Sequence, residues 1–281
     1  MLLPPTRLSL NGGRLNVVVD GGPAARPSHL RALARVTNRV AVLQMPQAHD
    51  SLDWLLPIAP QVEQLAVFDT CQDLSALQHF PRLQNLTLRF QPHAKTSPME
   101  RQAVTLHEYS GPWFPALDLV LASPVLTTLT LEQPPHDVAT RATAPLQRLR
   151  LLSAHKLAAV PALACTTTLT SLEIAGGKAL DLTGITAYTR LASLDLYGRT
   201  PLTSFAELAR CPSLRRLFLE ECYAVDDIDA LRRLTLDELR IVGRPENLDP
   251  DFLRTARNLG IRRFSAPRPP AAGRPRGEDG A

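Results

Sequence analysis

Charged and aromatic side chains that could bind another molecule gather in the second half of the sequence. They stand at alternate positions of short apolar segments, where Arg and carboxylate groups occur beside Tyr and Phe. This mixture is typical of binding hot spots, because it combines large contact area with directed charge. The predicted partner-binding residues are Arg150, Glu173, Asp195, Tyr197, Arg216, Phe218, Glu220 and Arg240.

The same charges could instead neutralise one another within the protein. Glu173 and Asp195 could both pair with Arg150, and such cross-strand pairs contribute little energy. Phe218 is harder to explain in this way, because an exposed Phe on a strand is expected to have no role in folding. Phe218 therefore favours the binding interpretation.

No pattern in the sequence predicts catalysis, a metal site or a cofactor. The seven His residues are scattered, without an H-E-x-x-H pair or a Cys/His spacing for zinc. Gly176-Gly177-Lys178 lacks the spacing of a phosphate-binding loop and the Ser or Thr that would follow it, so we interpret it as a turn. His107 is interpreted as an outward, solvent-exposed residue. We expect a protein that is not an enzyme and needs no cofactor.

The elements that must position these residues are repeats. An apolar phrase, Leu-x-x-Leu-x-Leu, starts at residues 169, 191, 214 and 236, at steps of 22, 23 and 22 residues. This period is too short for a pair of helices, and it indicates a solenoid in which each turn holds one short strand. Positions 4 and 6 of the phrase point into the core, and positions 3, 5 and 7 point outward.

The phrase can be followed towards the N-terminus. Earlier copies start at Leu146, Leu126, Leu83, Val62 and Val40, the last being Val40/Leu43/Met45. The gap of 43 residues between Leu83 and Leu126 is close to two periods, and we place a degenerate copy there with Val104 and Leu106 inward. Towards the C-terminus, a looser copy, Ile261/Phe264/Ala266, comes after the copy that starts at residue 236. This gives about eleven turns in all. The segment 91–110 is interpreted as a decayed repeat or, alternatively, a protruding loop.

The residues after each strand resemble the leucine-rich repeat family, in particular its short 22-residue bacterial class, the internalin-like repeats. The segment Val225-Asp226-Asp227-Ile228-Asp229-Ala230-Leu231 is similar to the return "L-x-D-I-x-x-L" of that class. The resemblance covers roughly residues 40–266. It implies an α/β fold, a right-handed leucine-rich-repeat solenoid with a parallel β-sheet on the concave face and short helical or irregular returns on the convex face.

The chain departs from the family at one position. The family usually has Asn three residues after the last apolar strand residue, where the amide bonds to neighbouring turns. Here the residues at that position are not Asn: Thr70, Ala154, Gly177, Arg199, Cys222 and Arg244. Without the Asn ladder, other groups must satisfy the buried backbone at each strand exit.

Both ends of a solenoid need covering. Residues 1–39 are predicted to form an N-terminal cap, because Asn11-Gly12 between alternating apolar segments indicates a β-hairpin and Ser28 could cap a helix. The repeats occupy residues 40–266 as one domain. A short helix over 249–259, with Phe252 and Leu259 inward, precedes the last strand. Residues 267–281, rich in Pro, Gly and Ala, are predicted to be a disordered tail.

Charge and cysteine content indicate the cellular environment in which the protein is expected to work. The net charge is +4, of which the last twenty residues supply +3, so the repeats are nearly neutral. Arg makes up most of the basic residues, which is typical of a bacterial protein with a high-GC genome. The four Cys residues show no disulfide framework and are expected to be buried thiols. The N-terminus lacks the pattern of a signal peptide and no apolar segment is long enough to span a membrane, so we expect a cytoplasmic protein.

These observations predict an interaction module, a monomer that binds a partner protein of unknown identity on its concave face. That function depends on analogy between folds as well as on the mixed patch. The alternative is binding of nucleic acid or another polyanion through the tail and through Arg148, Arg150, Arg215 and Arg216. The carboxylates that interleave with these Arg residues disfavour it.

Overall fold

The computed structural model shows a chain that divides into two compact units. The first comprises Met1–Leu152 with Leu163–Leu169, and the second comprises Ser153–Ala162 with Thr170–Ala281. The structure describes residues 6–11, 14–19, 30–32, 35, 40–44, 51–68, 73–89, 99–176, 180–198, 204–221, 227–243 and 250–266. The tail predicted over 267–281 lies outside these residues.

The first unit begins with an antiparallel pair, β1 (Thr6–Asn11) and β2 (Arg14–Val19), with Asn11 opposite Arg14. β2 then pairs in parallel with β3 (Val40–Gln44), and every later strand of the unit is parallel to its predecessor. The later strands are β4 (Val62–Val67), β5 (Asn85–Leu88), β6 (Glu108–Pro112), β7 (Thr128–Glu132) and β8 (Arg148–Leu152).

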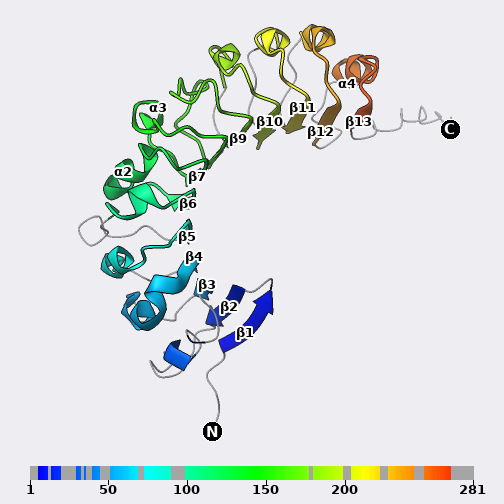
Figure 1. Cartoon of the computed structure of the whole chain (residues 1–281). Coiled ribbons are helices and arrows are strands. Elements are labelled where there is room, and N and C mark those ends of the chain that lie inside the picture. The colour runs from blue at the N-terminus through cyan, green and yellow to red at the C-terminus, as the bar shows by residue number, and fades with distance from the viewer. Residues whose placement is uncertain are drawn as a thin grey trace, which may run out of the picture. The chain divides into compact units, whose positions relative to one another are not determined.

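The strands of the first unit lie on its concave side and the helices on its convex side (Figure 1). The helices are short, of one turn or a few turns each. They are η1 (Asp53–Gln61), η2 (Ser75–His79), η4 (Gln102–Val104), η5 (Pro115–Leu117), α2 (Asp118–Leu121) and α3 (Val138–Arg141), where η denotes a 3-10 helix.

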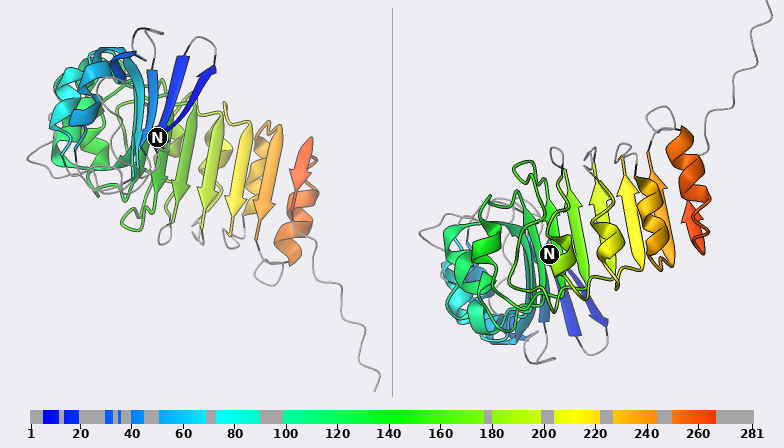
Figure 2. Two further views of the ribbon diagram at one scale, coloured as in Figure 1. Left: turned by 90° about the horizontal axis from the view of Figure 1, so that it is seen from below. Right: turned by 90° about the horizontal axis from the view of Figure 1, so that it is seen from above.

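The second unit repeats this plan. Its parallel strands are β9 (Ser171–Ala175), β10 (Ser193–Tyr197), β11 (Arg216–Glu220), β12 (Glu238–Val242) and β13 (Arg263–Ser265). Its returns contain η6 (Ile185–Ala187), η7 (Leu208–Arg210), η8 (Ile228–Arg233) and α4 (Pro250–Arg257). Figure 2 shows these strands side by side in the left view, with their returns behind them.

The predicted apolar phrase forms the core of each turn. Leu172, Leu194, Leu217 and Leu239 are in register across β9–β12, and each is at most 1% exposed. The residues between them point to the other side of the sheet, because side chains alternate along a strand. The solenoid predicted from the spacing, with one short strand in each turn, is therefore confirmed.

Two turns of the first unit differ from the prediction. In β3 the register shifts between Val40 and Ala41, so that Val42, not Leu43, lies beside the buried Leu65 of β4. Val42 itself is 3% exposed. The prediction was wrong by one residue here, because Val42 and Leu43 are both apolar and only the irregularity in the strand decides between them.

The degenerate turn was also placed wrongly. Val104 is 67% exposed at the end of η4. The strand lies further on, where Tyr109 is in register with Leu86 of β5 and Leu129 of β7. Leu106 is the buried first residue of this turn, so the described part of 91–110 is a repeat with unusual core residues, and residues 91–98 lie outside the described residues.

Tyr109 and Gly111 replace the two inward strand residues of that turn as a matched pair. The Tyr109 ring is fully buried, and its hydroxyl donates a hydrogen bond to the carbonyl of Pro112 at 2.6 Å. A Cβ atom at Gly111 would lie 2.6 Å from the backbone oxygen of Leu88 and 2.9 Å from the Tyr109 hydroxyl. The large ring fits because its neighbour has no side chain. Burial, with a contribution from Glu132, raises the pKa of Tyr109 well above its ordinary value.

Backbone conformation and backbone hydrogen bonds form the turn at the end of a strand, which we call the strand exit. The residue two places after the last apolar strand residue is left-handed in several turns, with φ between 49° and 77°: Gln133, Ser153, Gly176, Gly198 and Glu221. The exit amides donate to the end of the next strand, as Gly176 N does to Tyr197 O at 2.9 Å. Of the six residues named above at the family's Asn position, Ala154 is the one that the structure describes; it is buried, and its N–H donates to Ala175 O at 2.9 Å.

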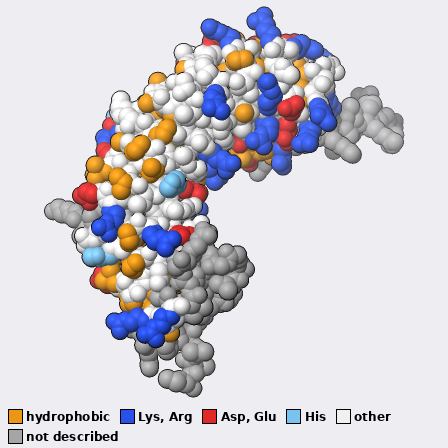
Figure 3. Space-filling view, in the orientation of Figure 1, with side chains coloured by type: hydrophobic (Ala, Val, Ile, Leu, Met, Phe, Trp, Pro, Cys, Tyr) orange, Lys and Arg blue, Asp and Glu red, His pale blue; other side chains and the backbone are white. Residues whose placement is uncertain are grey.

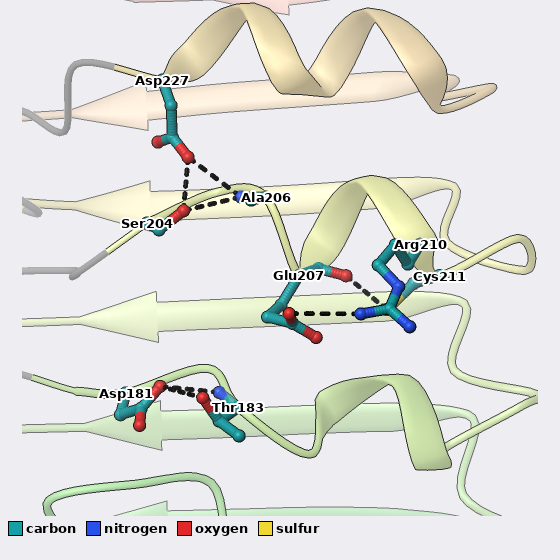
Figure 4. A network of polar contacts seen from close by, with 8 residues as sticks. All are labelled: Asp181, Thr183, Ser204, Ala206, Glu207, Arg210, Cys211 and Asp227. Atoms are coloured by element: carbon teal, nitrogen blue, oxygen red, sulfur yellow. Dashed lines mark hydrogen bonds and ion pairs between the residues drawn. The ribbon is translucent and has the colours of Figure 1, made fainter.

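Asp227 joins two successive returns of the second unit (Figure 4). Its carboxylate accepts hydrogen bonds from the N–H of Phe205 at 2.9 Å, from the N–H of Ala206 at 3.1 Å and from the Ser204 hydroxyl. Burial acts to raise the pKa of Asp227, but these hydrogen bonds outweigh burial and lower it. Asp181, in the return that contains η6, accepts bonds from the N–H and hydroxyl of Thr183 within its own turn.

Replacement of Asp227 by Ala is expected to lower the free energy of unfolding at about pH 7 by about 2 kcal/mol, because charge-assisted hydrogen bonds are lost and the part-buried N–H of Phe205 loses its acceptor. The lowered pKa means that this contribution is complete above the unfolded value of about 3.9 and disappears as pH falls through the folded value. Denaturant titrations would therefore show that the variant and wild type differ less in free energy of unfolding at about pH 3 than at about pH 7. Asp181→Ala is the control, with a smaller loss, and a pH-independent difference for Asp227→Ala would contradict the assignment.

Candidate binding face of the second unit

The register of the second unit places the predicted binding residues in three rows across its strands. The row nearest the strand starts contains Ser171, Ser193, Arg216, Glu238 and Arg263. The middle row contains Glu173, Asp195, Phe218, Arg240 and Ser265. Tyr197 beside Ala175, and Glu220 beside Val242, lie towards the strand ends. We call the surface of β9–β13 that carries these rows the second-unit face.

Three of the predicted residues form a cluster at the middle of this face. The rings of Tyr197 and Phe218 are 4.8 Å apart and inclined by 35°. The guanidinium carbon of Arg240 lies 5.2 Å from the centre of the Phe218 ring. Phe218 is thus enclosed on both sides and is half-buried rather than fully exposed.

These contacts correct one expectation. An aromatic pair contributes about 0.5–1.5 kcal/mol beyond its buried area, and a cation–π contact at an exposed site about 0.5–1 kcal/mol. Phe218 therefore has a role in stability that its position in the sequence did not indicate. The contacts also hold its ring in one orientation, which lowers the entropy that a partner must remove on binding.

Carboxylates and Arg residues surround the aromatic cluster. An open depression of about 280 Å³ is lined by Ser171, Ser193, Asp195, Tyr197, Arg216, Leu217, Phe218, Glu238 and Arg240. Glu173 and Asp195 lie in register on β9 and β10, so two acids occupy the side of the face that precedes Phe218. In Figure 3 charged side chains of both signs gather over the region where Figure 1 places β10–β13.

The structure brings seven of the eight predicted residues onto the second-unit face, and the eighth belongs to the first unit. Arg150 lies on β8, in register with Thr130 of β7. Arg148, named in the polyanion alternative, lies on the same strand, whereas Arg215 and Arg216 are in the second unit. Glu238 and Arg263 line the second-unit face but were not predicted. Their in-register positions beside Arg216 were the signal that could have found them.

The first unit carries a different surface. A depression of about 340 Å³ there is lined by Asn16, Val17, Ala41, Val42, Gln64, Leu65, Ala66, Asn85, Thr87 and Glu108. Its side chains are short or uncharged except for Glu108, which accepts a hydrogen bond from the Asn85 amide at 2.7 Å. The contrast between small residues in the first half and charged residues in the second half agrees with the sequence pattern.

The residues considered for chemistry are part of the scaffold. His107 precedes β6 rather than pointing outward from a strand; it is exposed, and its Nδ1 lies 2.9 Å from the carbonyl oxygen of Thr105. Gly176, the described residue of Gly176-Gly177-Lys178, is a strand-exit turn with φ +77°. Among the described residues, no three His, Cys, Asp or Glu side chains are grouped so that they could hold a metal ion.

The described cysteines are buried thiols, as predicted. Cys165 is 3% exposed and Cys211 is 2% exposed. Burial raises the pKa of both thiols, and for Cys211, with a further contribution from Glu207, to about 11. A thiol with so high a pKa is rarely ionised at neutral pH and is a poor nucleophile. Cys71 and Cys222 lie outside the described residues.

Within the described part of the chain, no helix has the length and apolar character needed to cross a bilayer.

Comparison with known proteins identifies the architecture. No protein-family model matches the sequence, and no curated protein matches it. Among solved structures, the chain is similar to an internalin, inlF, from Listeria monocytogenes, with a TM-score of 0.62 and 17% identity over 90% of this chain and 79% of that one. A PEPR1–AtPEP1 structure matches at 14% identity over 82% of this chain and 41% of that one, but with a TM-score of 0.32, too low to support an argument. The core rows, the exit turns and the match to inlF show that this chain has the fold of an internalin-like leucine-rich-repeat solenoid.

Proposed function

We propose that this protein is a non-enzymatic interaction module that binds a partner protein on the second-unit face. The observation that carries the proposal is the half-buried Phe218, held between Tyr197 and Arg240 on a rigid sheet. The partner contacts proposed on this face are Glu173, Asp195, Tyr197, Arg216, Phe218, Glu220 and Arg240. Arg150, on the first unit, stays a prediction.

Several properties of the cluster favour a protein over a small molecule. Aromatic and Arg side chains are enriched at the centres of protein interfaces, whereas a small-molecule site encloses most of its ligand. The depression of about 280 Å³ beside Phe218 is open and has charged walls. The side chains stand on parallel strands, so little backbone movement is needed on binding.

The proposal includes a monomer in the cytoplasm. The non-enzymatic part of the proposal is supported by the roles of the described residues that were considered for chemistry. The buried thiols pack in the core, and the strand-exit glycines form turns.

The double replacement Tyr197→Ala with Phe218→Ala tests the proposal. We expect the affinity for the partner to fall more than about tenfold, because hot-spot aromatics dominate the binding energy. The experiment captures partners from the native cell, identifies them by mass spectrometry and then measures the affinity of each purified partner by calorimetry. A photo-reactive Phe analogue in place of Tyr197 should cross-link to the same partner, and the analogue in place of Ala206, on the return side, should not.

A control variant distinguishes a loss of partner affinity from a loss of folding stability. The double variant also loses the aromatic and cation–π contacts, which costs about 1–2 kcal/mol of folding free energy. Asp227→Ala has a similar expected cost on the return side and should keep full affinity. If the double variant binds as tightly as wild type, or if the cross-link forms from Ala206 but not from Tyr197, the second-unit face is not the binding surface.

A further inference from the structure

A second depression, rich in Arg, lies at the strand-start end of the second unit. It measures about 320 Å³ and is lined by Ala192, Arg215, Arg216, Asp237, Glu238, Arg262 and Arg263. Four Arg against two carboxylates give it a local charge of +2. Arg216 and Glu238 also line the depression beside Phe218, so the two depressions adjoin. We call this depression the basic end of the second-unit face.

The Arg side chains of the basic end are available to a ligand. Among the described residues, Arg216, Arg262 and Arg263 form no ion pair within 4.0 Å. Arg216 and Arg263 are exposed. Only Arg215 is held by the protein, since it donates to the carbonyls of Pro212 at 2.9 Å and Leu214 at 3.0 Å.

The spacing of the charges selects the shape of the ligand. Arg216, Glu238 and Arg263 are in register on β11, β12 and β13, so a positive, a negative and a positive group follow one another across the strands. Neighbouring strands are about 4.8 Å apart, which places the two Arg positions about 9.6 Å apart. A polyproline-II segment has three residues per turn and rises about 3.1 Å per residue, so its residues i and i+3 point the same way about 9.3 Å apart.

We infer that the basic end binds an acidic polyproline-II segment of the protein partner, with Asp or Glu at every third residue. Carboxylates at i and i+3 then meet Arg216 and Arg263, whose guanidinium groups can each donate two hydrogen bonds to one carboxylate. The residues between them point away from Glu238. This inference rests on the proposed function, because the segment continues from the aromatic cluster through the shared residue Arg216.

The interleaved acids distinguish this ligand from nucleic acid. A nucleic acid strand presents an unbroken row of phosphates, some of which would lie against Asp237 and Glu238 and be repelled. A peptide with a charge at every third position avoids those contacts. Charge complementarity and spacing therefore both favour the acidic peptide.

The test uses the full chain and fluorescent peptides, measured by anisotropy at low and physiological salt. One peptide has four Glu-Pro-Pro triplets, and its control has the same composition with the Glu residues in adjacent pairs. We expect the triplet peptide to bind about fivefold more tightly than the control, and Arg216→Gln or Arg263→Gln each to weaken it about fivefold, because an exposed ion pair contributes up to about that factor. Arg210→Gln, which removes an exposed Arg of the return side, should leave the affinity unchanged.

Equal affinity for the two peptides, or no effect of Arg216→Gln, would overturn the inference. Tighter binding of single-stranded DNA of similar length, with a steep dependence on salt, would favour the polyanion alternative instead. The outcomes for the two proposals are separable. If Tyr197→Ala with Phe218→Ala abolishes partner binding while the triplet peptide fails, only the acidic-segment inference is wrong. If the peptide binds but the double variant retains its partner, the proposed function is wrong, and only the binding of an acidic segment at the basic end stands.

Discussion

Replacement of Leu217 by Asn is expected to lower the free energy of unfolding of the second unit by about 4 kcal/mol. Leu217 is 1% exposed and lies in register between Leu194 and Leu239. The loss combines the smaller apolar contact with an amide buried without a partner. Denaturant titration measures the total, and hydrogen exchange of β10–β12 shows where protection is lost.

The effect should extend beyond one turn. In a solenoid each turn is covered only by its neighbours, so a defect in β11 also exposes the apolar sides of β10 and β12. Arg216→Asn, on the same strand with its side chain outward, is the matched control and should change stability by no more than about 0.5 kcal/mol. Equal losses in the two variants would mean that Leu217 is not part of a shared core.

Replacement of Gly111 by Ala is the second large effect, with an expected loss of about 3 kcal/mol. The new methyl group would lie 2.6 Å from a backbone oxygen of Leu88, which cannot rotate away as a side chain could. The φ of +154° adds strain for any residue with a Cβ atom. Circular dichroism and denaturant titration of the purified variant measure the loss.

Gly184 provides a control that separates strain from collision. Its φ is +90°, and nothing lies within 4 Å of the place where a Cβ atom would stand. Gly184→Ala should therefore cost only the conformational part, about 1 kcal/mol. If both variants lose the same amount, the fit between Tyr109 and Gly111 does not account for the core of that turn.

The core could be predicted from sequence wherever the same apolar phrase recurs. Leu172, Leu194 and Leu217 stand at a nearly constant period, with steps of 22 and 23 residues. A buried parallel strand admits little except aliphatic residues. Where several residues in a row are apolar, as in Val40-Ala41-Val42-Leu43, periodicity cannot choose the register. There the irregularity between Val40 and Ala41 decides it.

The Tyr109 turn shows why a repeat can be misplaced although its period is intact. Leu106 follows Leu83 by 23 residues and precedes Leu126 by 20, so the spacing carried the correct answer. The prediction followed residue type and chose Val104, because Tyr and Gly do not resemble Leu. The exchange places one large ring and one glycine where the neighbouring turns have two Leu residues, and a search for single apolar positions does not detect such a pair.

The candidate site was predictable as a face but not as a set of contacts. Alternation along each strand indicates which residues point outward, and that identified Tyr197, Phe218 and Arg240. The sequence could not show that their rings and guanidinium group would pack together, because this depends on the register and rotamers of three strands. The back-reaching bonds of Asp227 escaped prediction for the same reason, since they join residues more than twenty positions apart.

The strand exits also bear on how such a chain changes length during evolution. Gly176 and Gly198 each donate to the end of the following strand through the same backbone bond. Because this junction uses no particular side chain, a genetic duplication or loss of one turn recreates it at the seam. Insertion of a whole turn therefore keeps this junction, provided that the new turn also brings the inward apolar residues of the core.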